Sequence, residues 1–124
     1  MNILIIGGSG FIGSYTARRL YIDGHKITIA DIRAPHRPNL LNIRHEYIHC
    51  DVNDEQQVSE VIKRSEYDVV YLLAGVIRAE DVREDPIASL NTNIVGLVNC
   101  LNACRDINLH RFVFSSTTHL YNCE

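Results

Sequence analysis

The sequence predicts an α/β fold built on a doubly wound parallel sheet, with helices on both faces and a truncation after about the fifth strand. Three observations support this prediction. Short apolar segments alternate with helical patterns along almost the whole chain. Glycines follow the first apolar segment at once, and the fourth apolar segment is nearly continuous, as in a strand covered on both faces. The 124 residues suit one domain, spanning 1–124.

The first part of the chain predicts two strands and one helix before a loop. Residues 2–7 are apolar and β-branched, which predicts a buried strand. Apolar residues recur at helical spacing over about 12–23, and Gly24 is a typical helix end. Alternation over 26–31 predicts the second strand. Two prolines and several basic residues in 32–44 predict a loop.

The middle of the chain continues the alternation of strands and helices. Residues 46–50 predict the third strand. Asp54 is a typical N-cap residue for the apolar helical stripe that follows it. Residues 68–73 predict a fourth strand buried on both faces, and the mixed charges of 80–85 predict a solvated loop. The order of elements therefore predicts parallel strands joined by right-handed crossovers.

A long helix and a fifth strand complete the pattern. Pro86 suits the first turn of a helix, and residues 111–115 predict a strand. Cys100 and Cys104 lie one turn apart and fit the buried side of that helix as small apolar fillers. A stripe of apolar residues falls on one side of the helix: Ile87, Leu90, Ile94, Leu97, Val98, Leu101 and Cys104.

Composition and charge exclude several classes of function. The formal net charge of -3 argues against nucleic acid or an anionic membrane as the main partner. The four cysteines form no Cys-x-x-Cys pair, and His45 and His49, which could share a strand face, have no evident third ligand, so no metal site is expected. The N-terminal apolar run is too short for a signal peptide or a membrane span. Together with the unpaired thiols, these features favour a cytoplasmic protein.

A glycine-rich turn, Gly7-Gly8-Ser9-Gly10-Phe11-Ile12-Gly13, follows the first strand. It fits either Gly-x-Gly-x-x-Gly or Gly-x-x-Gly-x-x-Gly. One glycine permits the tight turn, another lets the backbone approach a pyrophosphate, and a third allows close packing of helix on strand. The helix N-terminus then points free N–H groups at the phosphates. With a strand before it and a helix after it, the turn predicts a Rossmann-type dinucleotide site.

Asp31, at the end of the second strand, is the expected ribose-binding acid. It follows Gly13 at close to the spacing of about 20 residues that such sites show. A carboxylate there accepts hydrogen bonds from the adenosine ribose and repels a 2′-phosphate, which favours NAD over NADP. Ile32 and Arg33 follow directly, and Arg33 and Arg37 leave phosphate binding, and hence NADP, as the alternative.

Further motifs occur in order along nearly the whole chain. In its Gly-x-x-Gly-x-x-Gly register the turn resembles that of the NAD-dependent epimerase/dehydratase family, the extended short-chain dehydrogenases. Asp51-Val52 resembles the family's Asp-Ile/Val element, which implies that Asp51 binds the adenine amino group and Val52 packs on the ring. Residues 73–75 resemble its small-residue turn beside the cofactor. Pro86, followed by Asn-x-x-Gly at 93–96, resembles its helix after the fourth strand.

The last segment resembles the family's fifth strand and the Ser-Ser-(Ser/Thr)-x-x-Val-Tyr-Gly that follows it. This resemblance places Ser115 and Ser116 near the nicotinamide riboside and makes Thr117 the catalytic hydroxyl that hydrogen-bonds the reacting oxygen of the substrate. The cofactor-binding set that the pattern and the resemblance imply comprises Gly7, Gly10, Phe11, Ile12, Gly13, Asp31, Ile32, Arg33, Asp51, Val52, Leu73, Ala74, Gly75, Asn93, Ser115 and Ser116.

The resemblance is greatest to UDP-sugar 4-epimerases. Thr118 and His119 stand where sugar-nucleotide dehydratases have Asp-Glu, which disfavours dehydration. The resemblance therefore implies the NAD-binding portion of an enzyme that takes a hydride from a sugar carbon of a nucleotide-sugar substrate and returns it. The family's general base lies in a Tyr-x-x-x-Lys motif that these 124 residues do not contain, so we expect this chain alone to be inactive.

Two other functions stay open at this point. One is a non-catalytic dinucleotide-binding or sensing module, which predicts cofactor affinity without turnover. The other is an NADP-dependent reductase of the same family, which predicts a preference for NADP. For any of them, the exposed apolar edge of the fifth strand predicts a homodimer or other self-association.

Overall fold

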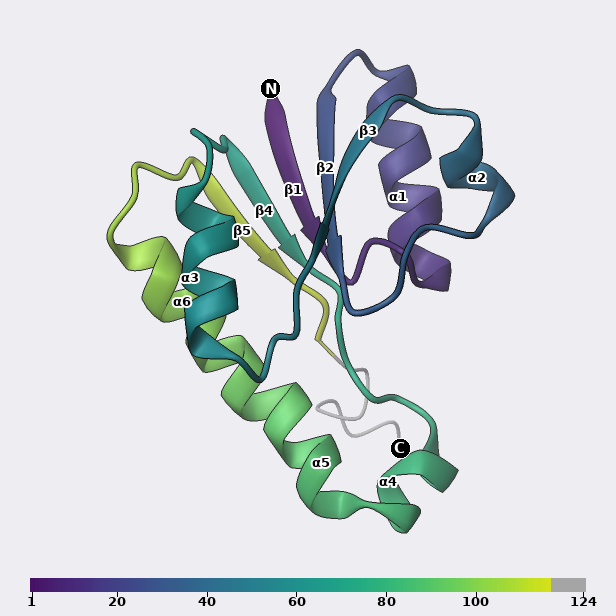
Figure 1. Cartoon of the computed structure of the whole chain (residues 1–124), viewed down its shortest axis with the longest axis vertical. Helices are drawn as coiled ribbons and strands as arrows, with labels where there is room; N and C mark the ends of the chain where they lie inside the picture. The colour runs from purple at the N-terminus through teal and green to yellow at the C-terminus, as the bar shows by residue number, and fades with distance from the viewer. Residues whose placement is uncertain (117–124) are drawn as a thin grey trace, which may run out of the picture.

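Five parallel strands form one sheet in the computed structural model, which describes residues 1–116 (Figure 1). Their order across the sheet is β3-β2-β1-β4-β5, so β5 lies at one edge. This arrangement confirms the predicted doubly wound parallel sheet, and the observed strands lie within a residue or two of the predicted ones. The strands are β1 (Asn2–Ile6), β2 (Lys26–Asp31), β3 (His45–His49), β4 (Val69–Leu72) and β5 (Arg111–Phe114).

β1 is the central strand and is buried on both faces. It pairs with β2 on one side and β4 on the other. Alternate side chains enter two separate cores, with Ile3 and Ile5 on one face and Leu4 and Ile6 on the other. All four are at most 1% exposed. A strand covered on both faces has no solvated side, which explains its uninterrupted apolar sequence.

One face of the sheet is covered by α1 (Phe11–Ile22) and α2 (Pro38–Leu41), on the right in Figure 1. Ala17 of α1 and Leu40 of α2 are fully buried in this core. The prediction of a loop over 32–44 was therefore wrong where α2 forms. Pro38 suits a first helical turn, and burial of Leu40 stabilises a helix too short to form by propensity alone.

α3 (Glu55–Lys63) and α6 (Gly96–Arg105) cover the opposite face of the sheet (Figure 1). Asp54 caps α3 as predicted, because its Oδ1 accepts a hydrogen bond from Gln57 N at 3.0 Å. A further short helix, α4 (Ala79–Glu84), replaces the predicted loop over 80–85. Its residues are exposed, but the acidic residues of its first turn and the basic residue of its last turn interact favourably with the helix dipole. Within residues 1–116, no helix is long and apolar enough to cross a membrane.

The predicted long helix runs from Pro86 to Arg105 in three sections: α5 (Pro86–Leu90), a π-helical turn η1 (Asn91–Val95), and α6. Its buried side consists of small residues, such as Gly96 and Ala103, together with the two predicted cysteines. Most of the bulky apolar stripe points away from the core instead, and Ile87 and Ile94 are 68% and 56% exposed. Small residues allow the helix to approach its neighbours closely, so the large side chains take the outer face.

Three cysteines lie within the core between the sheet and α3 and α6. Burial raises the pKa of Cys50 to about 11 and that of Cys100 to about 12, with smaller contributions from nearby groups. Burial also raises the pKa of Cys104 to about 11. These thiols are therefore neutral at physiological pH and act as apolar filler, as the sequence predicts.

We expect Cys50, Cys100 and Cys104 to resist alkylation in the folded protein. With a pKa of about 11, only about a thousandth of a thiol is ionised at pH 8, and burial blocks access as well. Peptide mapping by mass spectrometry after iodoacetamide treatment measures this for each cysteine. Labelling in urea serves as the control and is expected to be fast at all three. Labelling of Cys100 at equal rates with and without urea would contradict the buried position.

Candidate functional site

The predicted site residues gather at the carboxyl ends of the five strands, the lower edge of the sheet in Figure 1. The glycine turn follows β1 and Asp31 ends β2, while residues 51–52, 73–75 and 115–116 follow β3, β4 and β5. The chain proceeds outward from β1 in one direction to β3 and in the other to β5. The carboxyl ends of β1 and β4 thus form the switch point at which open parallel sheets bind their ligands.

The glycine turn leaves no room for side chains at two positions. Gly7 has φ +84°, and a Cβ there would lie 2.3 Å from the nitrogen of Ala74, in the loop after β4. A Cβ on Gly13 would lie 2.4 Å from the carbonyl oxygen of Gly7. The first contact brings the turn against the neighbouring loop, and the second packs α1 directly on the turn. These are the tight-turn and close-packing roles that the sequence pattern requires of glycine.

The N-terminus of α1 has no side-chain cap. Its N-cap residue is Gly10, whereas Asp54 and Asp85 cap α3 and α5 with their carboxylates. Helix geometry leaves the first N–H groups, including those of Phe11 and Ile12, without partners inside the helix. Together with the helix dipole, these donors favour an anion at the start of α1.

Asp31 holds the glycine turn from the adjacent strand. Its Oδ2 accepts a hydrogen bond from Ser9 N at 3.0 Å, and its Oδ1 accepts one from Arg33 N at 3.0 Å. The residue is 8% exposed, while Ile32 next to it is exposed. A carboxylate offers about four acceptor positions, so two hydrogen bonds leave capacity for ribose hydroxyls. The hydroxyl of Tyr47 donates to the Asp31 carbonyl, and burial with the Asp31 charge raises the pKa of Tyr47.

Arg37 closes the loop after β2 over the glycine turn, a contact that the sequence analysis did not anticipate. Its guanidinium lies 5.7 Å from the centroid of the Phe11 ring, and its Nε donates to the Ser9 carbonyl at 3.3 Å. The sequence suggested Arg37 only as a phosphate ligand, and it gave no role to Ser9. Motif spacing identifies residues that face a ligand but gives no signal for a side chain that stacks on a residue of another element.

The loop after β3 presents Asp51 with a defined orientation. Asp51 N donates to Gln57 Oε1 at 3.1 Å, and Asn53 N donates to Asp51 Oδ1 at 2.9 Å. The first contact holds the backbone and the second orients the carboxylate, whose Oδ2 has no hydrogen-bond partner among residues 1–116. Val52, the neighbouring predicted residue, is 6% exposed and packs in the core under α3 and α6.

Asn93 reaches the site through the loop after β4. Its Nδ2 donates to the Val76 carbonyl at 2.9 Å, and its Oδ1 accepts from Val76 N at 2.8 Å. A Cβ on Gly75 would lie 3.2 Å from the same Oδ1. Both polar atoms of the predicted cofactor residue are thus bound to backbone, so Asn93 fixes residues 73–76 from the π-helical turn. π-turns within α-helices often occur at functional positions.

The structure describes two of the three residues predicted at the catalytic end of the site. Ser115 and Ser116 follow β5 and are exposed. Thr117, predicted to be the catalytic hydroxyl, lies outside the residues that the structure describes.

The arrangement fits a bound dinucleotide. The uncapped start of α1 suits a pyrophosphate, and Asp31 at the end of β2 suits a ribose. The hydroxyl of Ser9, in the middle of the glycine turn, is buried and has no hydrogen-bond partner within residues 1–116. Asn2 Oδ1 and Tyr67 OH share this property at the opposite edge of the sheet, so the evidence for a ligand at the turn is the uncapped helix start and Asp31.

The model of the NAD-dependent epimerase/dehydratase family matches residues 3–123. The chain belongs to this family. The match spans the glycine turn, all five strands and the segment after β5, so it includes every motif on which the predicted resemblance rested.

Members of the family with related functions resemble this chain to a similar degree. It is 31% identical to a UDP-glucose 4-epimerase of Rhizobium meliloti, over 97% of this chain and 36% of the relative. It is also 31% identical to UDP-glucuronic acid decarboxylase 1 of Danio rerio, over 97% of this chain and 28% of the relative. A solved structure of Thermus thermophilus UDP-glucose 4-epimerase in complex with NAD shares 28% identity and a TM-score of 0.83, over 94% of this chain and 38% of that one.

The chain spans about a third of the length of these curated relatives. It corresponds to their N-terminal, NAD-binding portion, so the activity, substrates and partners of the whole proteins are proposals for this chain.

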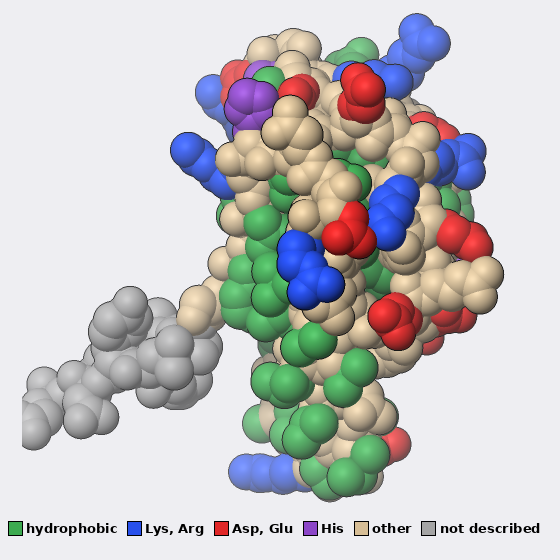
Figure 2. Space-filling model, turned by 90° about the vertical axis from the view of Figure 1, so that its left-hand side faces the viewer, with side chains coloured by type: hydrophobic (Ala, Val, Ile, Leu, Met, Phe, Trp, Pro, Cys, Tyr) green, Lys and Arg blue, Asp and Glu red, His purple; other side chains and the backbone are tan. Residues whose placement is uncertain are grey.

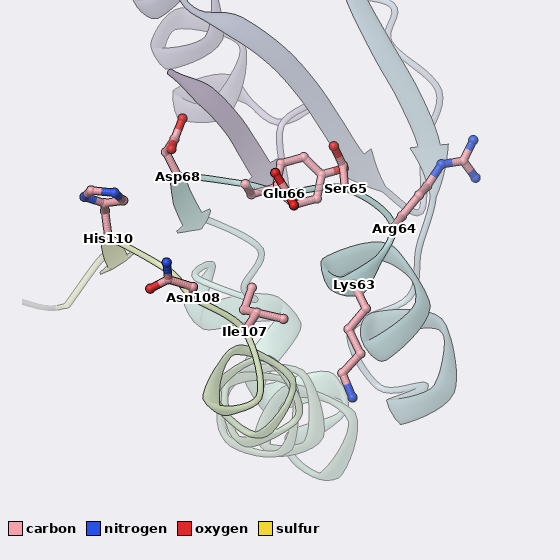
Figure 3. A pocket seen from close by; sticks show the side chains of 9 residues that line it. Lys63, Arg64, Ser65, Glu66, Asp68, Ile107, Asn108 and His110 are labelled. Carbon is pink, nitrogen blue, oxygen red and sulfur yellow. The ribbon is translucent and has the colours of Figure 1, made fainter.

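A groove at the opposite, amino-terminal edge of the sheet lies far from these family motifs (Figure 3). It measures about 520 Å³ and is lined by residues 63–68, 107, 108 and 110. Its cations have partners, since Lys63 lies 3.4 Å from Asp106 and Arg64 lies 3.1 Å from Glu46. Within residues 1–116, no three His, Cys, Asp or Glu side chains are grouped to hold a metal ion. The lysine and arginine of the groove are therefore paired with acids and form no cluster of unpaired cations.

We expect Asn93→Ala to lower the free energy of unfolding by ~1–3 kcal/mol, because it leaves the Val76 N–H and carbonyl without partners. Asn91→Ala, at an exposed position of the same π-turn, is the matched control and should change stability by less than about 0.5 kcal/mol. Urea unfolding followed by circular dichroism measures both. Equal stability of the two variants would show that the Asn93 contacts do not hold the loop.

Proposed function

We propose that this chain is the NAD-binding part of a nucleotide-sugar epimerase-type enzyme, which oxidises a sugar carbon transiently and returns the hydride. One observation carries the proposal: the uncapped N-terminus of α1 lies beside a buried aspartate that ends the adjacent strand and holds the glycine turn. The helix N-terminus suits the phosphates of a dinucleotide, and the aspartate suits its ribose. The NAD complexes of related 4-epimerase structures support the same cofactor.

The proposal assigns each part of the cofactor to a strand end. Gly7, Gly10 and Gly13, with the N–H groups of Phe11 and Ile12, bind the pyrophosphate. Asp31, flanked by Ile32 and Arg33, binds the adenosine ribose, and Asp51 and Val52 bind the adenine. Leu73, Ala74 and Gly75, held by Asn93, border the nicotinamide half of the cofactor, as do Ser115 and Ser116.

When bound, the nicotinamide supplies the acceptor and donor of the hydride. Thr117 orients the hydroxyl of the sugar that loses its hydrogen. Deprotonation of that hydroxyl is assigned to a Tyr-x-x-x-Lys pair, which the 124 residues do not contain, so the proposed role of this chain is binding and orientation rather than turnover. The sugar and the nucleotide are assigned by chemical class only, since relatives with different reactions are equally similar.

We further propose that a second copy of the chain binds the outer face of the Pro86–Arg105 helix. In Figure 2, hydrophobic side chains gather along this helix, including the part of the molecule that projects downward. The exposed members include Leu90, Ile94, Val98 and Leu101, spaced as one helical stripe. No charged residue occurs between Pro86 and Arg105, so two copies related by a two-fold axis would bring no like charges together.

Asp31→Asn tests the cofactor assignment. We expect the chain to bind NAD more tightly than NADP, since the carboxylate accepts from the ribose and repels a 2′-phosphate. The substitution should weaken NAD binding about 10-fold and reduce the preference for NAD over NADP, because it removes a charged acceptor. Titration calorimetry with both cofactors measures this, and Asp23→Asn, at an exposed acid of α1's end, is the control. An unmodified chain that prefers NADP would favour the reductase alternative instead.

Ile94→Glu tests self-association. We expect the unmodified chain to sediment as a dimer in a concentration-dependent manner, and Ile94→Glu to sediment as a monomer. The matched control is Ile22→Glu, at a similarly exposed isoleucine at the end of α1, which should leave the dimer intact. Analytical ultracentrifugation distinguishes the species. If Ile94→Glu associates as strongly as the unmodified chain, another surface, such as the edge of β5, makes the contact.

A further inference from the structure

Helix residues 91–105 hold the loop after β3 partly through Asn99 and Thr92, which belong to none of the predicted motifs. Asn99, on α6, is 7% exposed, and its Nδ2 donates to the Val52 carbonyl at 2.9 Å in a buried hydrogen bond. A second, exposed hydrogen bond joins Asn53 Nδ2 to Thr92 Oγ1 at 3.3 Å. The helix therefore binds the loop at two consecutive residues, through the carbonyl of Val52 and the side chain of Asn53.

The helix backbone also touches the side chain of Val52. A Cβ on Gly96 would lie 2.8 Å from Val52 Cγ2 and 3.0 Å from Val52 Cβ, so only glycine permits this approach. Val52 is thus fixed at its side chain by Gly96 and at its carbonyl by Asn99. These two contacts come from positions one helical turn apart, on the side of α6 that faces the loop.

An amide at position 99 has a specific reason to be there. The surrounding residues of α6 are small and apolar, and a buried polar side chain is costly unless it is hydrogen-bonded. Asn99 meets that requirement by donating to the Val52 carbonyl. Without the Asn99 donor, the Val52 carbonyl would be buried and unpaired, and the loop would move to expose it to water.

We propose that Asn99 is a positioning residue for the adenine end of the cofactor site, an inference that rests on the proposed function. Asp51 precedes Val52 directly, so its carboxylate moves with the peptide that Asn99 holds. The Asn53 N–H that orients Asp51 Oδ1 lies in the same short loop, on the other side of Val52. Asn99 therefore sets the position of the Asp51 carboxylate from the far side of the loop and does not itself contact the cofactor.

The test compares NAD with nicotinamide hypoxanthine dinucleotide, in which a carbonyl oxygen replaces the adenine amino group. The unmodified chain should bind NAD about 10-fold more tightly than the hypoxanthine analogue, because only NAD can donate a hydrogen bond from the amino group to a carboxylate. Asn99→Ala should lose most of this preference by weakening NAD binding alone. Asn102→Ala, an exposed asparagine one turn further along α6, should retain it. Titration calorimetry gives the affinities, and thermal unfolding confirms that each variant is folded.

Each outcome bears on a different claim. If the unmodified chain prefers NAD, Asp51→Ala abolishes the preference and Asn99→Ala retains it, the positioning role is overturned while the proposed function stands. An equal loss of affinity for both dinucleotides in Asn99→Ala also overturns it, because a merely structural defect has that effect. If the unmodified chain binds neither dinucleotide, the proposed function itself fails.

Thr92→Val decides the question if Asn99→Ala does not fold. This substitution keeps the size of the side chain and removes the acceptor of the exposed Asn53 hydrogen bond. It should reduce the preference for NAD about two-fold, since it loosens the same loop through a weaker contact. An unchanged preference in folded Thr92→Val would overturn the proposal.

Discussion

The close approach of backbones around the glycine turn is the constraint on which the rest of the site depends. Gly7 lies against the loop after β4, and Gly13 lies against Gly7, at distances that exclude any Cβ. Asp31 then binds Ser9 N from β2. Three strands and one helix N-terminus are thus brought to one point. The two glycine contacts join backbone to backbone, and the Asp31 carboxylate adds a side-chain contact to the backbone of the turn.

The Pro86–Arg105 helix links this point to the outer parts of the site. Asn93 binds Val76 in the loop after β4, and Asn99 binds Val52 in the loop after β3. Gly96, between them, lets the helix touch Val52. One helix therefore orients both loops with neutral amides on one side and presents an uncharged apolar stripe on the other. This division explains why a helix that carries cofactor-site residues has few large side chains in the core.

Sequence reasoning was most accurate where local signals determine the structure. Apolar runs identified the first and fourth strands, alternation identified the second, and the glycine pattern located the turn. The loops predicted over 32–44 and 80–85 contain helices. Burial of Leu40 stabilises the first and is not visible in local propensity, whereas the charge order that stabilises the second is a local signal that the loop prediction did not use. Periodicity placed the apolar stripe on one side of the long helix but carried no information on whether that side faces the core. The contacts of Arg37 and Asn99 join separate elements and have no motif.

The most direct test of the account follows the backbone amides of the 15N-labelled chain by NMR as NAD is added. The dinucleotide site at the carboxyl ends of the strands predicts saturable shifts at residues 8–13, around Asp31 and at Asp51–Val52, with little change in residues 63–68 at the opposite edge of the sheet. Shifts confined to residues 63–68, or none at saturating NAD, would contradict it.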